Sequence, residues 1–253
     1  MWVLVIMYVL LIPCTVVYIR AKHRLGGSVP LTVSLKAACT TIIVLAAVAG
    51  LTETRASMHI YAILMAGGLV LGLVGDVVIC LPEPRGLPVS GGLSELGGFL
   101  FGMIYFALGH LCYIGAFLRI STHPLWALPV FLVIYGMFLA VITRQAKKFS
   151  NMLIPTAIYG AIIATMLSLS ATAPFSNPKG YILPVAAVLF AVSDGLLAYN
   201  TFGGANDTNE TSFLRHCSAV FQQMHNTSRP LDWISLCCYF AGQSLFAVSI
   251  FCL

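Results

Sequence analysis

Charged residues are scarce in this chain. Lysine and arginine number 13 and aspartate and glutamate 8 among 253 residues, so 8% of the chain is charged while 59% is hydrophobic. Soluble domains carry about 25% charged residues. A chain with so few charges cannot cover itself with a water-facing surface, which excludes a cytosolic enzyme, a disordered chain, a coiled coil and a nucleic-acid-binding domain. The composition predicts a polytopic membrane protein.

The chain also lacks the usual metal-binding patterns. None of its eight cysteines forms a CxxC pair, and we interpret most of them as small buried hydrophobic residues. A zinc-dependent lipid amidase would need about three histidine ligands within the membrane. His110 is the one histidine in the interior of an apolar run, since His59 and His123 lie at the ends of runs. The sequence therefore predicts no metal site and no cofactor.

Long apolar runs are abundant. A membrane-crossing helix needs about 20 apolar residues, because its backbone must be satisfied internally. Eight such runs predict an all-α bundle of eight transmembrane helices forming a single domain over residues 1–253, with any chemistry housed inside the bundle. They cover Trp2–Ile19, Pro30–Leu51, Met58–Leu81, Leu96–Leu118, Leu125–Thr143, Met152–Ala171, Tyr181–Asn200 and Leu231–Leu253.

The positive charges are unevenly distributed between the loops. The loops after odd-numbered spans contain nine Lys and Arg residues, and the loops after even-numbered spans contain three. Since positive loops tend to stay in the cytoplasm, this bias predicts both termini on the far side of the membrane. Three N-x-S/T triplets in the last loop, at Asn206, Asn209 and Asn226, point the opposite way, because glycans are added on the lumenal side. We base the prediction on the charge bias, which also accounts for most of the net charge of +5 and gives no reason to expect a nucleic-acid partner.

Three charged residues lie inside predicted spans: Lys36, Asp76 and Asp194. Each costs about 2.5–3.5 kcal/mol on insertion scales, so such residues are retained when they are paired, hydrated or functional. With alternating helix directions, all three lie about 8 Å from the predicted cytoplasmic end at 1.5 Å per residue. Lys36 and one aspartate could form a purely structural ion pair. A single lysine cannot neutralise both aspartates, so we expect the surplus carboxyl to be protonated at neutral pH if it is buried.

Several uncharged polar side chains are expected inside the bundle near the three charged residues. Phe106, His110 and Tyr113 follow the i, i+4, i+7 pattern of one helical face, with His110 near the membrane midplane. His110 is either part of a site or a neutral core imidazole bonded to a neighbour. Glycines at Gly68 and Gly72 form a small-residue face that ends at Asp76 and favours close helix packing. The other candidates for lining a site are Tyr105, Tyr159, Tyr239 and Gln243, the last two one turn apart on one face.

A protonated carboxyl beside an ionised one, at the edge of an apolar cavity, suits hydrolysis through an oxocarbenium-like cation. Lys36 could bind a phosphate or adjust the acids, and the apolar interior could hold an alkyl chain. A proton-coupled transporter of lipids or small molecules would also place Asp, Lys and His inside a bundle. A non-catalytic lipid-binding protein is a third alternative.

Four segments carry a resemblance to a known family. In order and spacing, LGLVGDVVICLP, FGMIYFALGHLCYIGAF, LFAVSDGLLAYNTF and CCYFAGQSLF resemble the lysoplasmalogenase (YhhN-like) family of eight-span membrane proteins, and the lysine in SLKAACTTIIVL also fits. The motifs are G-D in the third span, H-x-x-Y in the fourth, S-D in the seventh and Y-x-x-x-Q in the eighth. They cover nearly the whole chain and add Ser193 to the candidate residues.

The resemblance implies hydrolysis of the vinyl-ether bond of lysoplasmalogens in the endoplasmic reticulum membrane, with a lysophospholipid and the bilayer as partners. Asp76 and Asp194 would be catalytic. One would protonate the vinyl β-carbon, and the other would stabilise the oxocarbenium and direct water to the α-carbon. The substrate-binding candidates are Lys36, Tyr105, His110, Tyr113, Tyr159, Ser193, Tyr239 and Gln243. The site would face the cytoplasmic leaflet, and both a monomer and a homo-oligomer are compatible with the sequence.

Overall fold

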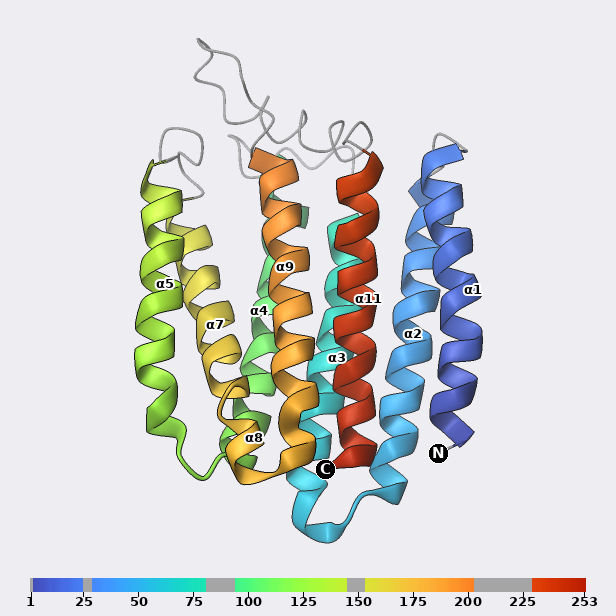
Figure 1. The fold of residues 1–253 in the computed structure, drawn as a ribbon. Coiled ribbons are helices and arrows are strands. Elements are labelled where there is room, and N and C mark those ends of the chain that lie inside the picture. Colours follow the sequence, from blue (N-terminus) through green and yellow to red (C-terminus); the bar gives the residue numbers. More distant parts are fainter. Residues whose placement is uncertain (1, 25–28, 81–93, 145–152, 203–228) are drawn as a thin grey trace.

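A computed structural model describes residues 2–24, 29–80, 94–144, 153–202 and 229–253. Within these ranges eight helices are long and apolar enough to cross a membrane, which confirms the predicted eight-span all-α architecture. Figure 1 shows them as one bundle. The long helices are α1 (Trp2–Arg24), α2 (Val29–Glu53), α3 (His59–Cys80), α4 (Ser94–Ile120), α5 (Ala127–Arg144), α7 (Leu153–Ser170), α9 (Ile182–Phe202) and α11 (Arg229–Cys252).

Short helical turns connect the spans at the end of the bundle that carries both termini (Figure 1). They are η1 (Ala56–Met58), η2 (Pro124–Trp126), α8 (Ala173–Ser176) and η4 (Pro178–Tyr181). Proline is the first or second residue of three of them, at a position where its missing N–H costs nothing. The side-chain oxygen of Asn177 accepts a hydrogen bond from the backbone N–H of Lys179 at 3.0 Å and caps η4. Helices α1, α3, α5 and α9 end at the opposite end of the bundle.

The interior is built around α3 and α11. Helix α3 packs most extensively against α4, and α11 packs against α9, α2 and α3. The close approach of α3 and α4 depends on glycine. A Cβ on Gly68 would lie 2.3 Å from Cε1 of Tyr113, and one on Gly109 would lie 3.0 Å from the backbone oxygen of Gly68. Of the predicted small-residue face of the third span, Gly68 therefore packs against the fourth span, where a larger residue has no room.

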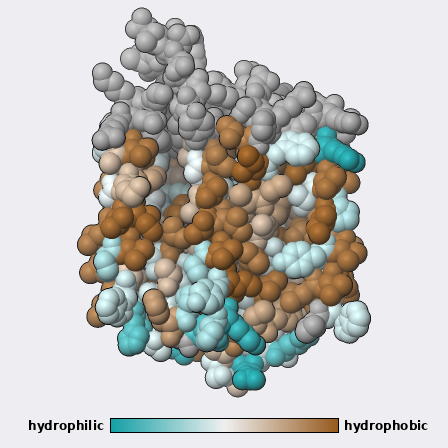
Figure 2. Space-filling model, in the orientation of Figure 1, coloured by the Kyte–Doolittle hydropathy of each residue, from teal (hydrophilic) through white to brown (hydrophobic). Residues whose placement is uncertain are grey.

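Apolar side chains cover the outside of the bundle. Figure 2 shows large hydrophobic areas along the helices, with the hydrophilic residues of the described part mainly toward the two ends. Helices α1 and α5 lie at the edges (Figure 1), and residues such as Val9, Ile12, Leu132 and Val133 are more than half exposed. This surface matches lipid tails, not water. Which end of the bundle faces the cytoplasm stays a prediction, and Asn206, Asn209 and Asn226 lie outside the described residues.

Candidate active site

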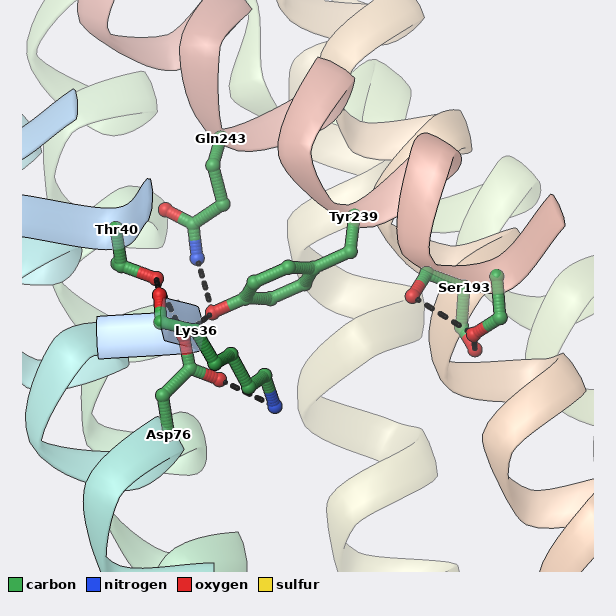
Figure 3. Close-up of polar contacts among 7 residues, drawn as sticks. Lys36, Thr40, Asp76, Ser193, Tyr239 and Gln243 are labelled. Atoms are coloured by element: carbon green, nitrogen blue, oxygen red, sulfur yellow. Dashed lines mark hydrogen bonds and ion pairs between the residues drawn. The ribbon is translucent and has the colours of Figure 1, made fainter. Parts of the chain in front are cut away.

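A buried ion pair joins α2 to α3. The ammonium Nζ of Lys36 lies 2.8 Å from Oδ1 of Asp76, and the Asp76 side chain is completely buried. The other carboxylate oxygen, Oδ2, accepts hydrogen bonds from the hydroxyl of Thr40 at 2.6 Å and from that of Tyr239 at 2.7 Å (Figure 3). The Lys36 ammonium also lies 5.4 Å from the centre of the Tyr239 ring. Side chains from α2 and α11 therefore hold the Asp76 carboxylate of α3 with one cation and two hydroxyl donors.

A second layer of side chains fixes Tyr239. The amide Nε2 of Gln243, one turn further along α11, donates to the Tyr239 hydroxyl at 3.2 Å (Figure 3), and the Tyr113 hydroxyl donates to Oε1 of Gln243 at 3.5 Å. Gly72 makes room for this amide, because a Cβ there would lie 3.0 Å from Nε2. The Tyr239 hydroxyl accepts one hydrogen bond and donates another, so its proton is directed at Asp76.

Asp194 forms the second acidic centre, between α7 and α9. Its Oδ2 accepts a hydrogen bond from the Tyr159 hydroxyl at 2.7 Å. Asp194 also interacts electrostatically with Lys36 and Asp76, which places the two aspartates around one region of the interior. Unlike Asp76, both Asp194 and Tyr159 are only half-buried. Asp194 therefore has fewer donors than Asp76 and more access to the surroundings.

His110 lies between the two acidic centres. Its ring contacts those of Phe190, Tyr159 and Tyr113, with centroid distances of 4.8, 5.7 and 6.1 Å. Tyr159 is the residue that binds Asp194, and Phe190 also contacts the ring of Tyr239 at 5.5 Å. The histidine Nδ1 is bonded to the backbone oxygen of Phe106. Since a carbonyl only accepts, Nδ1 carries the proton and Nε2 presents a lone pair.

The family model that matches this chain covers residues 31–250 and is described as the YhhN family. The chain belongs to the YhhN family. The match runs from the helix that carries Lys36 to the helix that carries Tyr239 and Gln243, so all the residues described above lie inside it. It confirms the family resemblance found in the sequence.

Curated relatives of this YhhN-family chain are named lysoplasmalogenase TMEM86B. The rat protein is 30% identical over 150 residues, the human protein 31% over 144 and the mouse protein 32% over 141. The aligned part is 55–56% of this chain and 51–53% of each relative, so the chain spans about half the length of the curated relatives it matches. No solved structure matches the chain significantly.

The fold brings most of the predicted site residues of this YhhN protein into one interior region. Two predicted residues lie apart from these contacts. Tyr105 is half-buried in α4 and makes no hydrogen bond or ring contact with other side chains in the described part of the chain. Ser193 is buried at the α9–α11 contact, where its backbone oxygen accepts a hydrogen bond from Ser235 at 3.1 Å. The residues brought together are Lys36, Asp76, His110, Tyr113, Tyr159, Asp194, Tyr239 and Gln243.

Sequence reasoning missed Thr40 and Phe190. Thr40 lies one helical turn after Lys36 and Phe190 one turn before Asp194, so each shares a helix face with a buried charge. This i, i±4 spacing was the available signal. A threonine or phenylalanine in an apolar span is so common that the spacing alone gives no reason to select either residue.

The contacts define the chemistry available in this interior. Asp76 and Lys36 form a direct ion pair. Asp194 has a tyrosine partner and no cation within ion-pair distance among the described residues. No three His, Cys, Asp or Glu side chains gather as metal ligands within the described ranges. The groups in place can donate, accept and relay protons, which suits acid–base catalysis.

Proposed function

We propose that this chain is a membrane-embedded hydrolase that cleaves the vinyl-ether bond of lysoplasmalogens, giving a fatty aldehyde and glycerophosphoethanolamine or glycerophosphocholine. The observation that supports it best is the unequal environment of Asp76 and Asp194 around one region of the bundle. Two carboxyls with different environments are the arrangement that acid-catalysed cleavage through an oxocarbenium ion requires. The names of the curated relatives support the choice of substrate.

The contacts suggest different roles for the two aspartates. Asp76 faces the Lys36 ammonium and two hydroxyl donors, and all three interactions favour the ionised carboxylate. We assign it as the group that stabilises positive charge. Asp194 has a tyrosine hydrogen bond and no partner cation among the described residues, so it is the aspartate left over once Lys36 is paired. We assign it as the protonated general acid.

The reaction then proceeds in balanced steps. The Asp194 proton moves to the vinyl β-carbon, and the double-bond electrons form the new C–H bond while the ether oxygen shares its lone pair with the α-carbon. The resulting oxocarbenium is stabilised by the nearby Asp76 carboxylate. Water adds to the α-carbon and gives one proton to a basic side chain of the site, forming a hemiacetal. The hemiacetal collapses to the aldehyde as that side chain protonates the departing glycerol oxygen and the hemiacetal hydroxyl proton moves to the Asp194 carboxylate, so proton transfer and water suffice without a cofactor.

Lys36 serves the site by compensating the charge of Asp76. The sequence allowed two roles for Lys36, binding of a substrate phosphate or adjustment of the charge state of the aspartates. The 2.8 Å ion pair with Asp76 favours the second role. A substrate phosphate would have to compete with a carboxylate already in contact with the ammonium. We place the head group of the substrate toward the end of the bundle opposite the two termini. Helix α3 ends on that side, and Asp76 lies four residues before its end. From the charge bias, we propose that this end faces the cytoplasmic leaflet of the endoplasmic reticulum.

Aldehyde release from a lysoplasmalogen by the purified protein tests the function. We expect activity in the wild type and a loss of about 10²-fold or more in Asp76→Asn and Asp194→Asn, because each removes a proton-transfer or charge-stabilising group. Asp232→Asn is the matched control, since Asp232 forms an ion pair with Lys22 at 2.7 Å between α11 and α1, outside the acidic centres. Wild-type rates in either site variant would remove that aspartate from the mechanism. An inactive wild type that transports a substrate into sealed vesicles would favour the transporter alternative.

A further inference from the structure

One nitrogen of His110 is buried without a partner. The residue is 1% exposed, and Nε2 has no hydrogen-bond partner in the described part of the chain. Leaving a buried acceptor unsatisfied costs about 1–3 kcal/mol, and such atoms in native proteins usually have a functional or ligand-dependent explanation. The Phe106 carbonyl fixes the ring so that Nε2 carries the lone pair. The imidazole is thus a neutral proton acceptor held ready in an apolar setting.

The Asp76 carboxylate is poorly placed to accept a proton from water. Lys36 occupies its Oδ1, and Thr40 and Tyr239 both donate to Oδ2. A carboxylate has about four lone-pair positions, and three are already engaged. The only other buried side-chain acceptor without a hydrogen bond in the described ranges is Asp76 Oδ1, and it contacts the Lys36 ammonium. His110 Nε2 is therefore the better base.

The rings that contact the imidazole differ in their exposure. Of the three rings that contact it, Tyr113 and Phe190 are each 1% exposed, whereas Tyr159 is half-buried. Tyr159 leads directly to Asp194, which is also half-buried. A donor that reaches Nε2 past Tyr159 would lie between His110 and the general acid. A water molecule there would be close to the carbon atoms on which Asp194 acts.

We propose that His110 is the general base that binds and deprotonates the hydrolytic water. This inference rests on the proposed function. As the water oxygen forms its bond to the α-carbon of the oxocarbenium, one water proton moves to Nε2 and its O–H electron pair stays on oxygen. The imidazolium then returns this proton to the glycerol oxygen as the C–O bond of the hemiacetal breaks. The remaining hydroxyl proton moves to the Asp194 carboxylate, which restores both groups for the next turnover.

Deuterium incorporation separates the water step from the protonation step. In the wild type in D2O, water traps the cation and aldehyde is released. In His110→Ala, Asp194 still delivers a deuteron to the β-carbon, but without bound water the cation rotates about its Cα–Cβ bond and loses the original β-proton to Asp194, which restores the double bond. We expect aldehyde release to fall about 10²-fold, and the unreacted lysoplasmalogen to gain one deuterium at the β-carbon, detected by mass spectrometry. Asp194→Asn should show neither aldehyde nor exchange.

A second variant and a control complete the experiment. His110→Gln keeps a polar side chain without a basic nitrogen, so it should match His110→Ala if the base is essential, and it carries the test if the alanine variant does not fold. His59→Ala changes an exposed histidine at the start of α3 and should behave as wild type. Aldehyde release within about threefold of wild type in both folded His110 variants, or loss of activity without exchange, would overturn the proposal. An inactive wild type would instead refute the proposed function.

Discussion

Lys36 and Asp76 form an ion pair across α2 and α3, with 2.8 Å between Nζ and Oδ1. Asp76 is thereby paired with Lys36, whereas the Asp194 carboxyl accepts a hydrogen bond from a tyrosine. In the proposed mechanism, these different partners make one aspartate the charged group and the other the neutral acid. The proposed reaction depends on that difference.

Removing the cation should destabilise the protein through Asp76. In Lys36→Met, a completely buried carboxylate loses its counter-charge. We expect the free energy of unfolding in detergent to fall by about 3 kcal/mol, at the low end for a broken buried pair because Lys36 is partly exposed. The double variant Lys36→Met/Asp76→Asn should recover much of this loss, because no unpaired charge remains, while staying inactive. Equal stability of Lys36→Met and wild type would contradict the assigned role.

Removing a tyrosine hydroxyl should affect the two acidic centres differently. Tyr239→Phe removes one of two hydroxyl donors to a buried carboxylate, at a cost of about 1.5–3 kcal/mol for a hydrogen bond to a charged group. Tyr159→Phe removes a hydrogen bond to a neutral acid, so we expect a smaller loss of about 0.5–1.5 kcal/mol. Thermal unfolding of both variants measures the difference. A larger loss in Tyr159→Phe would indicate that Asp194 is the ionised aspartate.

Two adjacent glycines in α3 provide a matched pair. A Cβ on Gly68 would lie 2.3 Å from the Tyr113 ring, whereas one on Gly67 meets nothing within 4 Å. Gly68→Ala should lower stability by about 1–3 kcal/mol through overpacking and shift Tyr113 away from Gln243. Gly67→Ala should be neutral or stabilising by up to about 1 kcal/mol, because alanine favours the helix. Similar unfolding temperatures for the two variants would show that α3 and α4 are not packed as described.

Chelation distinguishes the proposed chemistry from that of a zinc-dependent amidase. The proposed steps use proton transfer and water alone, so aldehyde release should be unchanged after dialysis against a strong chelator. Assays of treated and untreated protein, with zinc added back to a third sample, provide the measurement. Loss of activity that zinc restores would show that a metal participates and would require a different mechanism.

Much of the fold could be predicted from the sequence because the membrane imposes simple rules. Backbone polar groups must be satisfied within each segment, so apolar runs of about 20 residues identify helices almost by length alone. The same rules make Lys36, Asp76 and Asp194 conspicuous, since an intramembrane charge is costly. Tyr239 and Gln243 were found as a pair because helical periodicity places them on one face, and the structure joins them at 3.2 Å.

The site contacts could not be read from periodicity. Ser193 precedes Asp194 in the chain yet bonds to Ser235 in α11, because adjacent residues on a helix point about 100° apart. Thr40 was overlooked because a hydroxyl in a span usually bonds to its own helix. Here it also donates to Asp76 in the next one.

The sequence by itself determined that this is an eight-helix membrane protein with three charged residues inside its spans, because hydrophobic length and the cost of burying charge act locally along the chain. Only the tertiary structure decided that Lys36 pairs with Asp76, that Tyr159 holds Asp194 and that Nε2 of His110 has no partner in the described part of the chain. Those contacts depend on how helices rotate and approach one another, which is set by packing between residues far apart in the sequence.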